Sequence, residues 1–340
     1  MGAKEFKRFI EEKSEIIDME MEKLISEEQE IGNLHDAVKY ALGLDIPDRK
    51  KRGKRIRPIL CLLTVDSLGG NQDMALTFAI SIEFLHNFFL VHDDIEDGDK
   101  IRRNRPSVWV NYGLVNAINI GDFIFSKAYL NLSSLIGKEI DAEKFFKLYN
   151  LFTSTADHTI KGQALDMNAR YSDKILIDEY MHIVREKTGY YLSAPIIGGA
   201  IISDADEFII NSIKEFSFSI GPMFQIIDDV IDLTTGKGRG EKGSDIKEGK
   251  RSFLTAFTMS KCTSEEQARL VGILNKPRES TSDTDIIEVI SLYEKYNAIK
   301  FAKKKCEELF ESGTKAINKC PSTLRDNLIT AARFMIERET

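Results

Sequence analysis

The chain has 340 residues, enough for one large domain with a well-filled core. Hydrophobic residues make up 42% and charged residues 30%, which is the composition of an ordinary globular protein. The formal net charge of −7 argues against a general attraction to nucleic acid or anionic membranes. Any anionic ligand must therefore be bound by a local cluster of positive side chains.

The four cysteines form no Cys-x-x-Cys pair, so the sequence carries no disulfide framework or zinc signature. This usage favours a reducing cytoplasm. The first residues lack the apolar segment of a signal peptide. The longest apolar stretch, residues 78–91, is interrupted by Glu83 and His86. We therefore expect a cytoplasmic protein without a membrane span.

Apolar residues recur at helical spacing along most of the chain, and the alternation typical of strands is almost absent. Short connections predict a single all-α domain over residues 1–340, a bundle of about ten or more mostly antiparallel helices. The expected helices cover residues 4–30, 56–68, 73–97, 114–135, 141–169, 173–200, 204–233, 251–276, 284–317 and 321–338. Residues 233–250 hold five glycines and four lysines, which predicts a flexible basic loop.

Two Asp-Asp-x-x-Asp motifs each end an apolar helical run: Asp93, Asp94 and Asp97, and then Asp228, Asp229 and Asp232. The first and last aspartates of such a motif lie about 40° apart on one helix face. Like charges at this spacing destabilise a helix unless cations neutralise them. Oxygen ligands with room for water and phosphate suit Mg²⁺ rather than zinc. One motif alone is compatible with a solvated helix face, but the pair predicts a magnesium site.

Histidine and arginine side chains accompany the first motif. His86 lies seven residues before Asp93, hence about 20° away on the helical wheel, although a satisfied core histidine is the alternative. Positive clusters occupy residues 49–57 and 102–105. Metals and guanidinium groups together suit a diphosphate ligand. The first cluster alone is also compatible with a nucleic-acid patch, but it lacks interleaved aromatic residues.

Five segments occur in a fixed order: Gly53-Lys54-Arg55-Ile56-Arg57-Pro58, His92-Asp93-Asp94-Ile95-Glu96-Asp97 with Arg102-Arg103, Lys161-Gly162-Gln163-Ala164-Leu165-Asp166, Lys187-Thr188-Gly189, and Phe224 to Asp232. Together they resemble the trans-isoprenyl diphosphate synthases, or polyprenyl synthetases, of the short-chain farnesyl and geranylgeranyl type. The likeness covers about residues 50–252, and helices at 284–340 complete the expected domain. It implies a helical bundle around a central cavity and a homodimer.

The resemblance also implies an activity. An allylic diphosphate (dimethylallyl, geranyl or farnesyl) would ionise with the help of several Mg²⁺ ions. Isopentenyl diphosphate would then attack the allylic cation, and loss of a proton would give a longer allylic diphosphate. Asp93, Asp97 and Asp228 match the direct metal ligands. Asp94, Asp229 and Asp232 match further ligands or the groups that support them.

Other residues match the family's two diphosphate sites. The isopentenyl diphosphate pocket corresponds to Lys54, Arg57, His86 and Arg103. The allylic side, taken as catalytic, corresponds to Arg102, Lys187, Thr188 and Gln225. Gln163 and Asp166 would line the same cavity, unless they form a hydrogen-bonded core pair. Asn104 stands where the family usually has glycine.

The lysine-glycine loop is expected to close over bound diphosphate, because glycines permit the motion and lysines attract the ligand. Lys242 is favoured as the residue that contacts diphosphate. Lys237 is the other candidate, and Lys250 belongs to a later element.

Phe88 and Phe89 lie one helical turn before Asp93 and bear on product length. They are either ordinary core residues or a floor that stops the growing prenyl tail. In proteins of the family, aromatic residues here accompany short products. This favours farnesyl diphosphate, with geranylgeranyl diphosphate next.

Two other functions are weighed against this one. A class I terpene cyclase would carry Asn, Ser and Glu in its second metal motif, where this chain has three aspartates. A non-catalytic regulatory subunit of a heteromeric synthase would have lost acidic residues, and here both motifs are intact.

Overall fold

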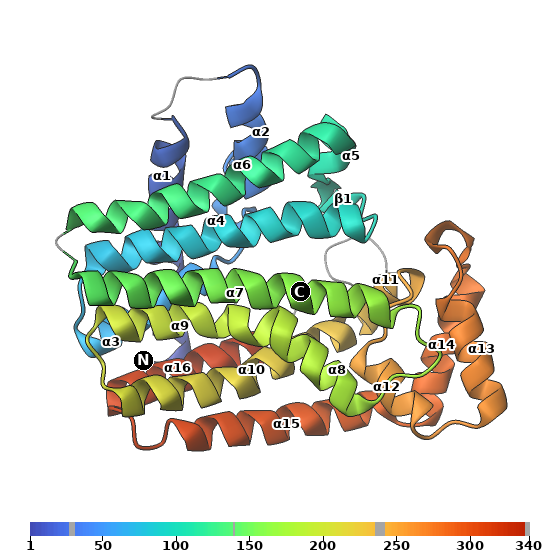
Figure 1. Ribbon diagram of the computed structural model, residues 1–340. Coiled ribbons are helices and arrows are strands. Elements are labelled where there is room, and N and C mark those ends of the chain that lie inside the picture. Colours follow the sequence, from blue (N-terminus) through green and yellow to red (C-terminus); the bar gives the residue numbers. More distant parts are fainter. Residues whose placement is uncertain (27–30, 139, 235–241, 337–340) are drawn as a thin grey trace. The chain divides into compact units, whose positions relative to one another are not determined.

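Helices form nearly all the regular structure of the computed structural model, which describes residues 1–26, 31–138, 140–234 and 242–336 (Figure 1). Within those residues the only sheet is a two-stranded antiparallel hairpin, β1 (Ile101–Arg102) and β2 (Arg105–Pro106). The expected all-α fold is confirmed.

The α-helices in chain order are α1 (Ala3–Ser26), α2 (Leu34–Leu42), α3 (Ile56–Leu68), α4 (Gln72–Glu96), α5 (Val108–Tyr112), α6 (Leu114–Ser133), α7 (Ala142–Ala169), α8 (Ile177–Val184), α9 (Tyr190–Ile202), α10 (Glu207–Thr234), α11 (Ser244–Lys247), α12 (Phe253–Met259), α13 (Ser264–Leu274), α14 (Asp283–Lys295), α15 (Ala298–Ala316) and α16 (Ser322–Ile336). A π-helical turn, η3 (Arg185–Gly189), joins α8 to α9.

The chain forms two compact units. Unit 1 comprises Met1–Thr153, Ala194–Asn211 and Cys320–Ala331, and unit 2 comprises Ser154–Ser193, Ser212–Lys319 and Ala332–Thr340. The expectation of a single domain stays a prediction.

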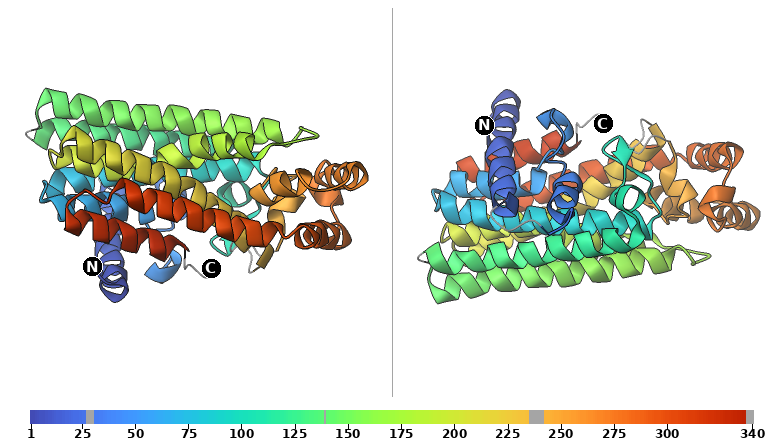
Figure 2. Two further views of the ribbon diagram at one scale, coloured as in Figure 1. Left: turned by 90° about the horizontal axis from the view of Figure 1, so that it is seen from below. Right: turned by 90° about the horizontal axis from the view of Figure 1, so that it is seen from above.

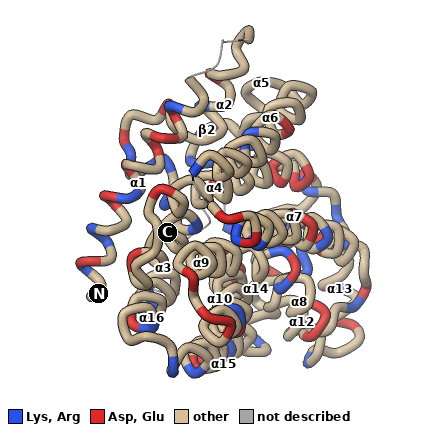
Figure 3. Tube along the Cα trace, turned by 60° about the vertical axis from the view of Figure 1, so that its left-hand side comes forward, with Lys and Arg blue, Asp and Glu red and all other residues tan. Residues whose placement is uncertain are grey.

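Unit 1 is built around α4, which packs along α3 and α6 (Figure 1). The helix begins where the Asn71 side chain accepts a hydrogen bond from the Met74 N–H at 2.9 Å. Its core side chains include Phe78, which leaves no room for a Cβ atom at Gly198. Helix α1 buries an apolar stripe and carries bands of both charges along its length (Figure 3).

Helix α4 is, among the described residues, the one helix long and apolar enough to cross a membrane. Of its most apolar window, 83% is buried inside the structure, as in the core helix of a globular protein. The helix is therefore weak evidence for a membrane span.

In unit 2, α12 packs against α8, α14 and α15. Phe301 of α15 stacks on Phe257 at 4.0 Å between ring centroids. Helices α13 and α14 lie side by side as a hairpin in every view (Figure 2). Each begins with a capping box, Thr263 with Glu266 and Ser282 with Asp285.

Several predicted boundaries are wrong. The helix expected at 251–276 is two helices, because the Thr263 cap starts a new one. The helix expected at 284–317 breaks at Asn297, whose φ of +57° is left-handed. The helix expected at 173–200 begins only at Ile177 and contains the π-helical turn. Part of the loop predicted at 233–250 is helical, since α10 continues to Thr234 and α11 follows.

Candidate active site

The first acidic motif closes helix α4 in unit 1. The Asp97 N–H bonds to the Asp93 carbonyl at 2.8 Å, so both aspartates belong to the last helical turn. Asp94 is buried, and its carboxylate accepts hydrogen bonds from Arg102 Nε at 2.9 and 3.0 Å and from Arg102 Nη2. Asp93 and Asp97 are half-buried. The buried aspartate thus fixes Arg102, whereas the other two are partly exposed.

A tight hairpin positions the paired arginines after this motif. Arg102 pairs with Arg105 across the hairpin, and Arg103 and Asn104 form the turn with φ values of +53° and +58°. Two-residue hairpin turns of this kind require positive φ at both positions, which asparagine tolerates better than most residues. The structure therefore accounts for Asn104 where the family usually has glycine.

Three residues assigned to the isopentenyl diphosphate pocket come together in unit 1. Arg57 Nη1 donates to His86 Nε2 at 3.2 Å. Burial, and then the charges of Arg57 and Arg103, hold the pKa of His86 well below its usual value, so the ring is neutral. Burial also lowers the pKa of Arg103 to about 9, and its Nη1 donates to the Ala41 carbonyl at 2.7 Å. Lys54 is exposed two residues before α3 begins.

Arg55, which sequence reasoning did not single out, has a structural role. Its Nε donates to Asp18 at 2.9 Å, its Nη1 to Glu83 at 2.7 Å and its Nη2 to the Leu42 carbonyl at 2.8 Å. All three charged side chains are buried. The signal in the sequence was Glu83, an acid inside an apolar helical run. Part of the basic cluster at residues 49–57 is thus neutralised inside the protein.

The second acidic motif lies on α10 in unit 2. Asp229 accepts hydrogen bonds from the Tyr180 hydroxyl at 2.8 Å, Gln225 Nε2 at 3.1 Å and the Phe253 N–H at 3.1 Å. Burial, followed by the Asp229 charge, raises the pKa of Tyr180 well above its usual value, so the hydroxyl keeps its proton.

The third aspartate of this motif is also held by protein donors. Asp232 accepts from the Ser244 hydroxyl at 2.6 Å and from the Asp245 N–H at 3.1 Å. Asp229 and Asp232 are almost completely buried, whereas Asp228 is half-buried. The second motif therefore also combines buried and half-buried aspartates, but it has two buried members where the first has one.

This division bears on metal binding. Among the described residues no three His, Cys, Asp or Glu side chains form a ready-made metal cluster. The three half-buried carboxylates, Asp93, Asp97 and Asp228, have the right donor chemistry for Mg²⁺, an ion that keeps waters and takes phosphate oxygens. The buried partners are engaged by protein donors. Each motif, taken within its own unit, therefore has carboxylates that fit a magnesium ion completed by phosphate oxygens.

The π-helical turn η3 presents the residues expected on the allylic side. Lys187 Nζ lies 2.8 Å from Asp166 Oδ2. The Thr188 hydroxyl donates to Gln225 Oε1 at 3.3 Å. The Thr188–Gln225 hydrogen bond links η3 to the second motif, because Gln225 also donates to Asp229. Gln163 is buried on α7, one turn before Asp166.

Of the lysines in the glycine-rich segment, Lys250 lies at the second motif. Its Nζ is 3.6 Å from Asp229 Oδ1 and 3.6 Å from Asp245 Oδ2. Lys242 is exposed, and Lys237 lies outside the described residues. The sequence placed Lys250 in a separate, later element, so its proximity to Asp229 was missed.

Phe88 and Phe89 are buried in an aromatic group of unit 1. Their ring centroids are 5.0 Å apart, and Phe88 lies 4.6 Å from Phe125 of α6. Phe125 in turn contacts Tyr129 at 5.0 Å. Both phenylalanines thus belong to a packed aromatic row one turn before the first motif.

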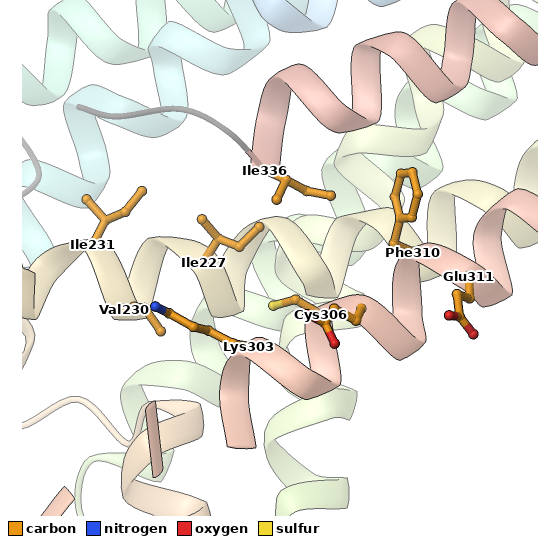
Figure 4. A pocket seen from close by; sticks show the side chains of 9 residues that line it. Ile227, Val230, Ile231, Lys303, Cys306, Phe310, Glu311 and Ile336 are labelled. Carbon is orange, nitrogen blue, oxygen red and sulfur yellow. The ribbon is translucent and has the colours of Figure 1, made fainter. Parts of the chain in front are cut away.

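A pocket of about 540 Å³ lies on another face of α10 (Figure 4). Ile227, Val230 and Ile231 of α10 face Cys306 and Phe310 of α15 across it. The helix that carries the second motif therefore has a buried polar face and a separate apolar face.

Known proteins similar to this chain agree with these features. The family model described as "Polyprenyl synthetase" matches residues 48–292. A geranylgeranyl diphosphate synthase of Saccharolobus solfataricus is 32% identical over 289 residues, covering 84% of this chain and 86% of that protein. A farnesyl diphosphate synthase of Bacillus subtilis is 32% identical over 261 residues, covering 71% of this chain and 88% of that protein.

A solved structure extends the likeness to nearly the whole chain. The crystal structure of geranylgeranyl pyrophosphate synthetase from Pyrococcus horikoshii has a TM-score of 0.84 and 31% sequence identity, covering 98% of each chain. The motifs, the helical fold and these matches agree. The chain belongs to the polyprenyl synthetase family.

Proposed function

We propose that this protein elongates an allylic diphosphate by condensing it head to tail with isopentenyl diphosphate. The observation that carries the proposal is the shared design of the two acidic motifs. In each, buried aspartates are held by protein donors, and half-buried aspartates carry carboxylates with the donor chemistry that Mg²⁺ prefers. Family membership supports the same reaction class.

In the proposed reaction the allylic C–O bond breaks and diphosphate leaves. The double bond of isopentenyl diphosphate forms the new C–C bond, and a proton is lost from the adjacent carbon. The products are inorganic diphosphate, a proton and an allylic diphosphate longer by five carbons. Asp93 and Asp97 of the first motif, and Asp228 of the second, would each hold magnesium, which would supply positive charge to the leaving diphosphate.

The chain's own residues bind and orient the substrates. Arg57 and Arg103 supply the positive charge for isopentenyl diphosphate. His86, which bonds to Arg57, is neutral and adds a ring nitrogen without charge. Lys54, exposed just before α3, would reach the same ligand. Arg102, fixed by Asp94, serves the allylic diphosphate.

The remaining groups serve the allylic side. Lys187 and Lys250 supply charge to the diphosphate, and the Thr188 and Gln225 oxygens stabilise the developing allylic cation. Gln163 lines the cavity. Preorganised dipoles of this kind need no rearrangement as charge develops.

For the product we propose geranylgeranyl diphosphate, with farnesyl diphosphate second. The Saccharolobus and Pyrococcus proteins carry the first name and the Bacillus protein the second. The farnesyl preference drawn from Phe88 and Phe89 stays a prediction.

The deciding experiment is incubation with Mg²⁺, isopentenyl diphosphate and each short allylic diphosphate, followed by chromatography of the products. Asp93→Asn and Asp228→Asn should each reduce turnover by about a hundredfold or more, since each removes charge that stabilises the leaving group. Asp36→Asn, at an exposed site on α2, is the matched control. Absence of any elongated product from the wild type, or near-normal turnover of either motif variant, overturns the proposal.

The protein is further proposed to act as a homodimer in the cytoplasm. Apolar side chains on α6 favour a second copy as the occupant of that face: Val115 is 80% exposed, Ile118 43% and Leu130 60%. Val115→Lys should therefore shift the protein towards the monomer in sedimentation, whereas a wild type that is already monomeric contradicts the idea.

The four free cysteines are compatible with a reducing compartment.

A further inference from the structure

The π-helical turn η3 is held on one side by three positions of α7. His158, Gly162 and Asp166 are spaced four residues apart, so they follow one another along one face at about 6 Å intervals. His158 Nδ1 lies 2.6 Å from Glu186 Oε2, and Asp166 Oδ2 lies 2.8 Å from Lys187 Nζ. The two side-chain contacts thus hold two consecutive residues of the turn, Glu186 and Lys187.

Between these two pairs the helix comes into backbone contact with the turn. A Cβ atom at Gly162 would lie 2.2 Å from the Lys187 nitrogen and 2.7 Å from the Glu186 carbonyl carbon. Such distances are far below any real contact, so the position requires glycine. The backbone of Lys187 therefore rests directly on α7.

Helix α10 approaches the same turn with a second glycine and a polar side chain. A Cβ atom at Gly221 would lie 2.7 Å from the Gly189 Cα atom. Gln225, one helical turn later, accepts the hydrogen bond of Thr188 at 3.3 Å. The turn that carries Lys187 and Thr188 is thus held from α7 and from α10.

The His158 ring is itself fixed by stacking. It lies parallel to the Tyr190 ring, with 3.6 Å between centroids and 1° between planes. Tyr190 packs edge-on against Phe218, 4.9 Å away. A stacked ring has little freedom, so the direction in which Nδ1 meets Glu186 is set before any ligand arrives.

A neighbouring pair on the same helix shows what an ordinary surface interaction looks like. Lys161 and Asp157 pair at 2.6 Å with 62% and 55% of their side chains exposed. His158 and Glu186 are only 29% and 15% exposed. Since partly buried charge-assisted hydrogen bonds are stronger than exposed ion pairs, the His158–Glu186 contact restrains the backbone and the surface pair does not.

From this geometry we propose that His158 and Glu186 are positioning residues for prenyl transfer. Their contact, with the stacked Tyr190, fixes η3 so that Lys187 and Thr188 meet the allylic diphosphate in the reactive orientation. This inference rests on the proposed function, because it assigns Lys187 and Thr188 to the allylic substrate. The π-helical geometry fits a functional role, since such turns recur at functional sites.

The test uses variants that separate the contact from the ring. His158→Phe keeps the ring on Tyr190 and removes the donor, and Glu186→Ala removes the acceptor. His158→Asn removes the ring but places an amide nitrogen where Nδ1 stood, so it should restore the contact. Lys161→Ala is the matched control on the same helix.

The first readout needs no substrate. Backbone amide exchange of peptides covering residues 184–190, followed by mass spectrometry, should be faster in His158→Phe and Glu186→Ala than in wild type, and near wild type in His158→Asn. Unchanged exchange in both disruptive variants overturns the restraint of η3. This result does not depend on whether the protein is a prenyl transferase.

The second readout is steady-state kinetics. His158→Phe and Glu186→Ala should lower kcat by about tenfold to a hundredfold, the effect of misplacing a reacting group by roughly 1 Å. The KM for the allylic diphosphate should rise, and the KM for isopentenyl diphosphate should stay within about twofold. His158→Asn should recover most of the activity.

The outcomes are distinguishable. Faster exchange with unchanged kinetics overturns the positioning role and leaves the structural restraint. Equal effects on the KM of both substrates, or no recovery in His158→Asn, also overturn it. A wild type that elongates no primer overturns the proposed function instead, while the exchange data still decide whether the contact restrains η3.

Discussion

Lys250 Nζ lies 3.6 Å from Asp229 Oδ1, inside the second acidic motif. Burial alone would lower the pKa of Lys250, but the charges of Asp245 and Asp229 raise it well above the usual value. The ammonium group therefore stays charged across the working pH range. It is ready to bind a diphosphate oxygen without a change of protonation.

Lys250→Ala is expected to raise the KM for the allylic diphosphate about tenfold to a hundredfold, the effect of losing one charge-assisted hydrogen bond. Lys242→Ala, at an exposed position, should change it by less than about threefold. Lys250→Arg, which keeps the charge beside Asp229, checks that folding is not the cause. The opposite order of the two alanine variants would return the role to Lys242.

The buried Arg55 network should dominate the stability of unit 1 around α1 and α4. Arg55→Met removes the main partner of two buried carboxylates, leaving Asp18 with Arg52 at 3.3 Å and Glu83 with the Asn87 amide at 3.1 Å. This is expected to lower the free energy of unfolding by about 3–5 kcal/mol. Arg49→Met, which loses only an exposed pair with Glu15, should cost at most about 1 kcal/mol. Urea titrations of both variants measure the difference. Similar decreases in the free energy of unfolding for the two variants would mean that the buried network stabilises the protein no more than an exposed ion pair does.

His86 predicts a dependence of stability on pH. Its pKa is lowered in the folded protein, by burial first and then by Arg57, so below about pH 6.5 the unfolded chain binds a proton that the folded chain does not. Its contribution is present above that pH and is lost as the pH falls, at up to about 1.4 kcal/mol per unit. Unfolding at pH 7.5 and 5.5 should show a smaller decrease for His86→Asn than for wild type. His182→Asn, at an exposed site, should follow the wild type.

Product length should depend on the aromatic row. Replacing Phe88 and Phe89 together by alanine removes two rings next to Phe125 and is expected to lengthen the product by at least one isoprene unit. Phe146→Ala, at an exposed position on α7, is the control. Chromatography of the chains measures the change. An unaltered distribution would place the floor elsewhere, such as on the helix that carries Gln163.

The predicted helices were correct where apolar periodicity sets their extent. They were wrong where a capping residue or a single backbone angle ends one helix and starts the next. Periodicity continues through Thr263 and Asn297, so two pairs of helices were each read as one. The Thr263–Glu266 capping box could have been predicted from the sequence, because threonine followed three residues later by glutamate is its usual pattern. The left-handed φ of Asn297 could not be predicted, because asparagine also occupies caps and turns with negative φ.

For the candidate site, the sequence identified residue types but not their partners. Spacing put the three aspartates of each motif near one face, yet it did not show that Asp94 and Asp229 are held by Arg102 and Tyr180. Tyr180 comes from a different helix, 49 residues away. Such long-range pairs depend on packing, which no local pattern reports.

The π-helical turn η3 can be viewed as one residue inserted into an otherwise continuous α-helix running from α8 into α9. Deleting Gly189 would let α8 continue into α9 as a regular α-helix, with the flanking turns kept in place and the π-helical turn removed. A single-codon deletion would thus change how Lys187 and Thr188 are presented, although every side chain named in the site would still be present. Lineages that gained or lost this one codon would differ in the turn while retaining both aspartate motifs. Counting residues between the Lys187-Thr188 pair and the second motif is therefore as informative about relatives as comparing the residues themselves.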